Sequence, residues 1–263
     1  MTENPVQGLH VDACDLSKIK AVQRTESAMN TAAKPTTAPQ ENQLLAALSP
    51  SERERWWPHL ETVTLKRGQV LCESGVDPDH AYFPITAIVS LVYLTLDGES
   101  TETAVVGREG MVGISLFMGG SATPTEAVVQ SAGLAYRLRS QFIRSEASAA
   151  SPVLQVLLRY TLTMMAQVAQ TAACNRFHSI DQLYCRRLLM GLDRSSSDEL
   201  TLTQEHAASL LGVRREGVTA AAHKLQGRGA IRYRRGQICV LDRQQLEAST
   251  CDHIPYRQSA ASA

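Results

Sequence analysis

Basic side chains gather in the C-terminal third of this 263-residue chain, at spacings suited to a polyanion. From Thr203 to Arg243 stand eight basic and three acidic residues, although the whole chain has no net charge. Arg214, Arg215 and Glu216 are consecutive. Arginine can bind guanine through two hydrogen bonds, and glutamate can accept one from cytosine. The segment therefore predicts contact with double-stranded DNA, since phosphate neutralisation supplies most non-specific affinity for DNA.

Glycines separate the elements that must position these side chains. Thr203 is a good N-cap for a short helix that ends at Gly212, and a second helix is expected from about Arg214 to Gln226. Residues 231–241 predict a hairpin around Arg234-Arg235-Gly236. This order is that of a winged helix-turn-helix, whose second helix enters the major groove. The expected DNA-contacting residues are Thr203, Gln204, Arg214, Arg215, Glu216, Thr219, His223, Lys224, Arg234 and Arg235.

A long helical pattern from Ser151 to about Met190 precedes this segment, and residues 151–177 are expected to form a dimerisation helix. One apolar stripe consists of Val153, Leu157, Tyr160 and Met164. A second stripe repeats at spacings of four and three, as in a coiled-coil seam. It comprises Leu154, Leu158, Thr161, Met165, Val168 and Ala172. Two stripes predict that the helix packs on its own domain with one and on a second copy with the other; a single wide core face is the alternative.

Residues 44–150 contain short β-branched runs separated by turn residues, which predicts a small antiparallel barrel or roll. Asp97-Gly98 lies between two such runs and predicts a type I′ hairpin turn. Residues 1–43 are rich in Thr, Ala, Gln and Pro without periodicity, and are expected to be a disordered tail. The DNA-binding domain is expected over residues 178–250, with a flexible tail over 251–263.

Several classes of protein and site are not expected from this sequence. No run of about 18 apolar residues is present, and the first ten residues lack the features of a secretory signal, so a cytoplasmic protein without a membrane partner is predicted. The six cysteines include no CxxC pair, and the histidines show no ligand spacing. No metal site and no cofactor are therefore predicted. Hydrolase, metalloprotease and nucleotide-binding motifs are also missing, so we expect no enzyme.

From Leu44 to Leu246 the chain resembles the Crp–Fnr superfamily of bacterial transcription regulators. The resemblance is carried by "LKRGQVLCESGVDPDHAYFPITAIVSLVYLTLDGES" and, more specifically, by "LTQEHAASLLGVRREGVTAAAHKL", with Arg215 and Glu216 as the base-reading pair. It implies an α+β fold with an N-terminal β-roll sensor, a long dimerisation helix and a C-terminal winged helix-turn-helix. It also implies a homodimer on an inverted-repeat DNA site, with RNA polymerase and an unknown small-molecule effector as candidate partners.

The sensor half departs from the cyclic-nucleotide-binding members of this family. Those members hold the ribose with a Gly-Glu pair and the phosphate with an Arg-Ser or Arg-Thr pair, whereas Ile114 follows Gly113 here and Pro124 precedes Thr125. Glu126 is expected to repel an anion. We therefore predict that cyclic AMP is not the effector. The candidate pocket residues are Arg108, Gly113, Ile114, Ser115, Pro124 and Thr125. A regulator that responds to a cyclic nucleotide, another small ligand or a redox change, and a protein-interaction module with a winged fold, remain alternatives.

Overall fold

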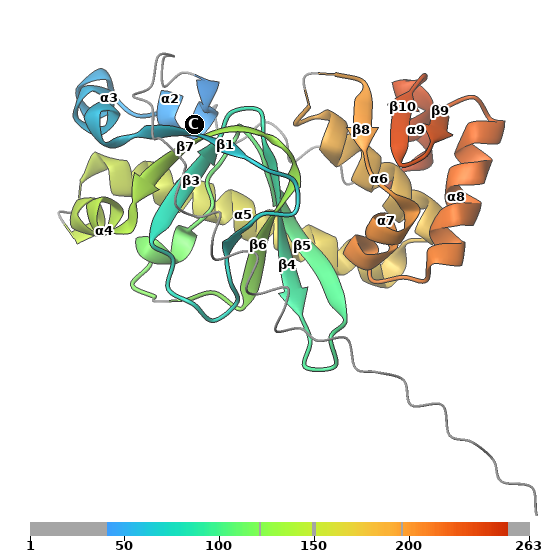
Figure 1. Ribbon diagram of the computed structural model, residues 1–263, viewed down its shortest axis with the longest axis horizontal. Helices are drawn as coiled ribbons and strands as arrows, with labels where there is room; N and C mark the ends of the chain where they lie inside the picture. The colour runs from blue at the N-terminus through green and yellow to red at the C-terminus, as the bar shows by residue number, and fades with distance from the viewer. Residues whose placement is uncertain (1–40, 121, 149–150, 196, 252–263) are drawn as a thin grey trace, which may run out of the picture. The chain divides into compact units, whose positions relative to one another are not determined.

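The computed structural model describes residues 41–120, 122–148, 151–195 and 197–251 (Figure 1). The predicted tail over residues 1–40 and the end of the chain from 252 lie outside the described residues. No helix in the described ranges is long and apolar enough to cross a membrane.

Two antiparallel sheets form the N-terminal half, as the β-roll prediction requires. One has the strand order β1-β7-β3 and the other β2-β6-β4-β5. The strands are β1 (Glu61–Leu65), β2 (Val70–Cys72), β3 (His80–Pro84), β4 (Ile88–Leu94), β5 (Ser100–Val106), β6 (Thr125–Ser131) and β7 (Gly133–Arg139). The short helices of this half are α2 (Gln43–Ala46), α3 (Pro50–Trp56), η2 (Trp57–His59), η3 (Ile114–Leu116) and α4 (Ser140–Ser148). Its largest core side chains, Trp56, Phe83 and Tyr136, are fully buried.

The folded part of the chain begins earlier than the sequence indicated. Asn42 is fully buried, caps α2, and donates from Nδ2 to the carbonyl oxygens of Pro84 and Gly110, each at 2.9 Å. The prediction of a disordered tail through residue 43 is therefore wrong for Asn42 and Gln43. The far end needs a similar correction, because Cys251 was assigned to a flexible tail and is buried.

The turn between β4 and β5 is not of type I′. That type needs a positive φ angle at both central residues. Here φ is positive at Gly98, at 82°, but not at Asp97. Gly98 N donates to Thr95 O at 3.1 Å, and Thr95 N donates to Glu99 O at 2.9 Å. A tight turn followed by a left-handed glycine is the three-residue hairpin alternative, which Asp-Gly also favours.

The long helix α5 (Pro152–Phe177) has the predicted bounds, and it ends where Ser179 and Gln182 form a capping box for α6 (Ile180–Leu192). The stripe of Val153, Leu157, Tyr160 and Met164 is buried in the core of the roll. Tyr160 donates to Met111 O at 2.9 Å, and its ring fills the place that a Cβ at Gly110 would need. One predicted face of α5 therefore packs on its own domain.

The second stripe of α5 is exposed, except at Thr161 and at Leu154, which is partly buried against the core of the roll. The side chains of Leu158, Met165 and Val168 are 46%, 62% and 41% exposed. Thr161, which the heptad spacing assigned to this seam, is only 4% exposed and donates to Leu157 O. Leu162, at 65%, lies on the exposed face instead.

A winged helix-turn-helix follows. Its elements are α6, β8 (Glu199–Thr201), α7 (Gln204–Leu211), α8 (Arg215–Gly227), β9 (Ile231–Arg234), β10 (Gln237–Val240) and α9 (Arg243–Ser249), with the strand order β8-β10-β9. Of these helices, α7 and α8 agree with the sequence prediction within one residue, whereas α6 and α9 were not predicted as separate helices. The domain has its own core, in which Tyr184, Leu188, Val218, Ala222 and Leu225 are buried.

Candidate DNA interface and sensor pocket

The turn between α7 and α8 depends on a cap and a glycine. Thr203 Oγ1 accepts a hydrogen bond from His206 N at 3.1 Å and so begins α7. Gly212 ends the helix in the left-handed region with φ 63°, where a side chain would be strained. Arg214 then caps α8 with extended backbone. The first turn of α8 thus begins with Arg215 and Glu216, both exposed.

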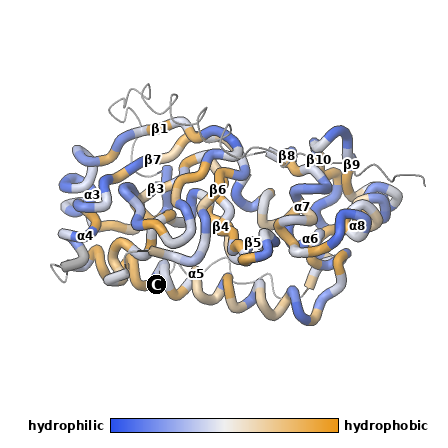
Figure 2. The backbone as a smooth tube through the Cα atoms, turned by 60° about the horizontal axis from the view of Figure 1, so that its bottom comes forward, coloured by the Kyte–Doolittle hydropathy of each residue, from blue (hydrophilic) through white to orange (hydrophobic). Residues whose placement is uncertain are grey.

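Helix α8 has one buried and one exposed face. Val218, Ala221, Ala222 and Leu225 point into the domain core. Arg215, Thr219 and His223, spaced four residues apart, form a row along one flank of the helix beside Glu216, and all but the half-buried Thr219 are exposed. Figure 2 shows hydrophilic stretches along this helix. The structure therefore brings the expected base-reading residues onto one accessible face.

Contacts within the domain already hold some of these side chains. Thr219 Oγ1 donates to Gln204 Oε1 at 2.7 Å, which ties α8 to the start of α7. Arg215 Nη1 lies 3.5 Å from Glu205 Oε2 in an exposed ion pair. Lys224 Nζ lies 2.7 Å from Asp181 Oδ2 at the start of α6. Pairs this exposed are worth about 0–1 kcal/mol, so DNA phosphates can compete with the two carboxylates.

Packing against another helix explains why residue 217 is a glycine, and the neighbouring residues in the sequence do not indicate this contact. A Cβ at this position would lie 2.6 Å from Ile180 Cδ1. The flank of α8 that bears Gly217 therefore packs against the start of α6. A residue with a side chain fits here only if Ile180 moves, because the two helices approach so closely.

The wing presents the remaining arginines. Arg234 ends β9 and Arg235 forms the tip, and both are exposed. Arg235 is the only non-glycine residue with positive φ in the described ranges, at 47°, and Gly236 follows at 81°. The buried Gly236 accepts from Leu202 N at 2.8 Å, which holds the wing beside the start of α7.

The predicted effector residues lie on separate parts of the roll. Gly113, with φ 103°, caps η3, which contains Ile114 and Ser115. Ser115 is buried, and its hydroxyl has no hydrogen-bond partner among the described residues. Pro124, at the start of β6, is exposed, as is Arg108 after β5. The exposed Arg108 therefore gives no support to the suggestion that it reaches into the pocket.

Glu126 does not face the interior of the roll, where its repulsion of an anion was expected. Along β6 it alternates with Ala127, which lies in the core of the roll, so Glu126 is on the outer face and Thr125 on the inner one. Burial raises the pKa of Glu126, and the nearby Glu73 raises it further. Its repulsion of an anion inside the roll is weaker than predicted. The loss of the arginine at Pro124 is the stronger departure.

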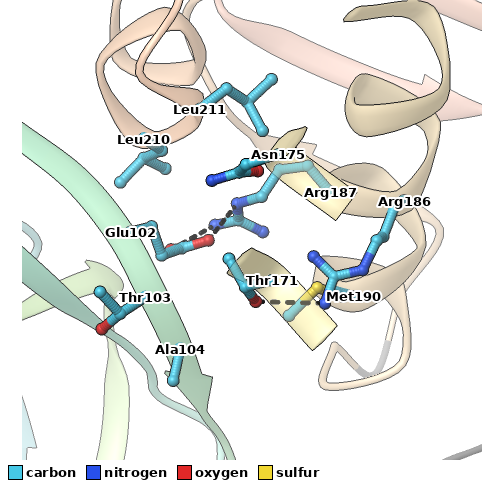
Figure 3. A pocket seen from close by; sticks show the side chains of 10 residues that line it. All are labelled: Glu102, Thr103, Ala104, Thr171, Asn175, Arg186, Arg187, Met190, Leu210 and Leu211. Atoms are coloured by element: carbon cyan, nitrogen blue, oxygen red, sulfur yellow. Dashed lines mark hydrogen bonds and ion pairs between the residues drawn. The ribbon is translucent and has the colours of Figure 1, made fainter. Parts of the chain in front are cut away.

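A contact that the sequence did not indicate joins the roll to the winged domain (Figure 3). Glu102 of β5 and Arg187 of α6 point toward each other, and Thr171, Asn175, Leu210 and Leu211 surround them. Arg187 Nε lies 2.9 Å from Glu102 Oε1, at an angle unsuited to a hydrogen bond, while Nη2 donates to Oε2 at 3.3 Å. Burial lowers the pKa of Arg187, and the Glu102 carboxylate opposes that shift.

Further contacts extend along the same two strands. Ser90 Oγ also donates to Glu102 Oε2. The hydroxyls of Ser100 and Ser209 lie 2.7 Å apart, and Thr101 Oγ1 donates to Leu210 O at 3.5 Å. Val92 of β4 belongs to the apolar core of the winged domain. The β4–β5 hairpin therefore touches the helix-turn-helix, and an ion pair between Glu109 and Arg194 joins the segment after β5 to the segment just after α6.

Two family models match this chain. Residues 62–149 match the cyclic nucleotide-binding domain, and residues 185–249 match the Crp-like helix-turn-helix domain. No curated protein is close enough in sequence to be matched.

Solved structures show the same fold at low identity. A putative Crp/Fnr-family regulator from Eubacterium rectale is 18% identical with a TM-score of 0.64, covering 80% of this chain and 98% of its own. FixK2 from Bradyrhizobium japonicum is 15% identical with a TM-score of 0.63, covering 73% and 98%. The c-di-GMP-responsive regulator CLP from Xanthomonas campestris is 16% identical with a TM-score of 0.57, covering 73% and 99%.

The first matched domain corresponds to the β-roll and the second to the winged helix-turn-helix. The second contains α8, with its exposed face, and the wing. The two matched domains indicate a regulator rather than an enzyme. The chain belongs to the Crp/Fnr superfamily of transcription regulators.

Proposed function

We propose that this regulator binds an inverted-repeat DNA site as a homodimer, with the first turn of α8 reading bases and the wing binding phosphates. The observation that carries the proposal is that Arg215, Glu216 and His223 are exposed on α8, with the half-buried Thr219 beside them. Arginine and glutamate at the N-terminus of a recognition helix meet base edges, whereas Arg234 and Arg235 on the wing suit the DNA backbone. A cytoplasmic location, and RNA polymerase as a further partner, belong to the same proposal.

Fluorescence anisotropy with the preferred DNA site, across a salt series, tests these roles. Arg215→Ala should cost about 1–3 kcal/mol and relax the preference at one base pair in each half-site. Arg235→Ala should weaken binding to all sequences alike and reduce the dependence on salt. A uniform loss in both variants contradicts the assignment of Arg215 to base reading. Binding that is insensitive to salt would favour a protein-interaction module instead.

The exposed stripe of α5 supports the homodimer. Leu158, Leu162, Met165 and Val168 leave an apolar surface on a helix whose other face is already packed. Large exposed apolar patches are typical of interaction sites. In a dimer with two-fold symmetry, both copies would contribute this same surface to the interface. Recognition helices in such a dimer would lie about 34 Å apart, one turn of DNA.

The sensor is proposed not to use cyclic AMP as its switch. A phosphate bound in the roll needs a cation, because an unpaired buried anion is costly. Where the cyclic-nucleotide-binding members carry arginine, this chain has Pro124, and the buried polar group at η3 is the neutral hydroxyl of Ser115. An effector without a phosphate fits these groups better than a cyclic nucleotide does.

Isothermal titration of the full chain with cyclic AMP tests this part of the proposal. We expect no saturable binding at micromolar concentration and no change in DNA affinity. Saturable binding that tightens the DNA complex would contradict it. The fold that this chain shares with a c-di-GMP-responsive regulator makes c-di-GMP a suitable second titrant, and its binding would equally contradict a phosphate-free effector.

A further inference from the structure

Three side chains with metal-ligating atoms meet where the dimerisation helix joins the winged domain. They are Cys174 near the end of α5, His178 just after it, and Cys251 two residues beyond α9. Their ligand atoms all lie within 4.8 Å of one another. The two sulfur atoms are 3.6 Å apart, although 77 positions separate the residues in the chain.

Local structure explains why they converge. Cys174 and His178 are four residues apart and so share one side of the helix end, where His178 N donates to Cys174 O at 3.0 Å. Cys251 is brought there because α9 packs on α6. Leu183 is buried in the same small cluster as the two cysteines, and Leu211 packs against it. The cluster thus has two buried thiols, with the half-buried imidazole of His178 at its more open side.

The geometry suits a tetrahedral metal ion. Bonds of about 2.3 Å from zinc to sulfur place two sulfur ligands roughly 3.8 Å apart, close to the spacing found here. Thiolate and imidazole ligands select zinc over calcium or magnesium, which prefer oxygen. Two thiolates would also balance the charge of a divalent ion in apolar surroundings, with the two thiol protons released to solvent.

We propose that Cys174, His178 and Cys251 form a Zn²⁺ site that joins the end of α5 to the segment after α9. Three protein ligands leave the fourth position to water, which reaches the ion from the side of His178. The ion links both ends of the winged domain, because α6 begins at Ile180 and α9 ends at Ser249. It therefore braces the connection between the dimerisation helix and the DNA-binding domain.

Metal content and a cobalt spectrum of the untagged, reduced full chain test the site directly. After incubation with Zn²⁺ and gel filtration, we expect one zinc ion per chain by mass spectrometry of the metal. Co²⁺ in place of zinc should give the intense thiolate-to-cobalt charge-transfer absorption that sulfur ligands produce. Cys174→Ser and Cys251→Ser should abolish that absorption, and His178→Gln should weaken it. Cys185→Ser is the matched control, since Cys185 is also buried but lies outside the cluster, and it should keep the metal.

The zinc content and the cobalt spectrum of the wild-type chain test the proposal even if a cysteine variant fails to fold. A wild-type chain that shows no thiolate-to-cobalt absorption overturns the proposal. So does zinc uptake that persists in folded Cys174→Ser and Cys251→Ser. A third contrary result is a wild-type chain that takes up no zinc and, on mild oxidation, yields a Cys174–Cys251 linked peptide, which would make the pair a disulfide switch. None of these readouts depends on DNA binding, so they are separable from a failure of the proposed function.

Discussion

Breaking the ion pair between Glu102 and Arg187 should destabilise the protein far more than breaking an exposed one. The two side chains are 7% and 3% exposed, so either charge left alone stays out of water. Removing one partner of a buried pair costs about 3–5 kcal/mol, whereas replacing both with apolar residues is often close to neutral. Glu102→Leu and Arg187→Met are therefore each expected to lower the free energy of unfolding by about 3–5 kcal/mol.

A double-mutant cycle measures the interaction itself. Urea unfolding is followed by far-ultraviolet circular dichroism at one fixed protein concentration, because dimerisation would otherwise shift the apparent stability. We expect the double variant to lose much less than the sum of the two single losses, so that the coupling free energy exceeds about 1 kcal/mol. The control cycle uses Arg144 and Asp77, a pair with side chains 39% and 53% exposed, whose coupling should be about 0–1 kcal/mol. Losses at Glu102 and Arg187 that add within about 0.5 kcal/mol would refute the reasoning.

Three further predictions address assembly, helix packing and pH. Leu158→Glu combined with Met165→Glu should halve the mass measured by light scattering, and an unchanged mass would move the interface away from α5. Gly217→Ala should raise the free energy of unfolding of an Ile180→Ala variant by about 1 kcal/mol, because alanine has the higher helix propensity. In the wild type the increase should be smaller, because the new Cβ meets Ile180. Equal effects in both backgrounds would contradict this contact. Burial lowers the pKa of His206, so the unfolded chain binds its proton more readily and stability should fall as pH drops below about 6.5. His206→Gln should lessen that fall in a pH series of urea unfolding, and an identical slope in the two proteins would exclude His206 as its cause.

Local signals predicted the winged domain well, because each of its boundaries depends on neighbouring residues. Thr203 caps α7 through its own side chain, and Gly212 ends the helix in a conformation that suits glycine. The end of α5 at Phe177 follows from the capping box that begins at Ser179. Signals of this kind act within four residues and are visible in the sequence.

The errors arose where the outcome depends on a neighbour in space. The heptad pattern placed Thr161 in the exposed seam, but an α-helix drifts against a seven-residue repeat, and Leu162 is exposed in its place. The prediction of a flexible tail from residue 251 was wrong for Cys251, because no local signal shows that α9 packs on α6 and buries this cysteine. Glu102 carries no local sign of its ion pair, because its partner Arg187 follows 85 positions later.

The register of the four-stranded sheet places the candidate pocket close to the DNA-binding half. Val92 of β4 lies opposite Glu126 of β6 on one side and Glu102 of β5 on the other. Its side chain belongs to the core of the winged domain, and Glu102 holds Arg187 of that domain. Thr125, the inward-facing candidate pocket residue, precedes Glu126 directly and pairs with Tyr93. An effector that moved the start of β6 would therefore act on the DNA-binding domain across a single strand. Because packed cores resist continuous deformation, a small displacement of that strand would favour a second arrangement of the β4–β5 hairpin rather than a gradual bend.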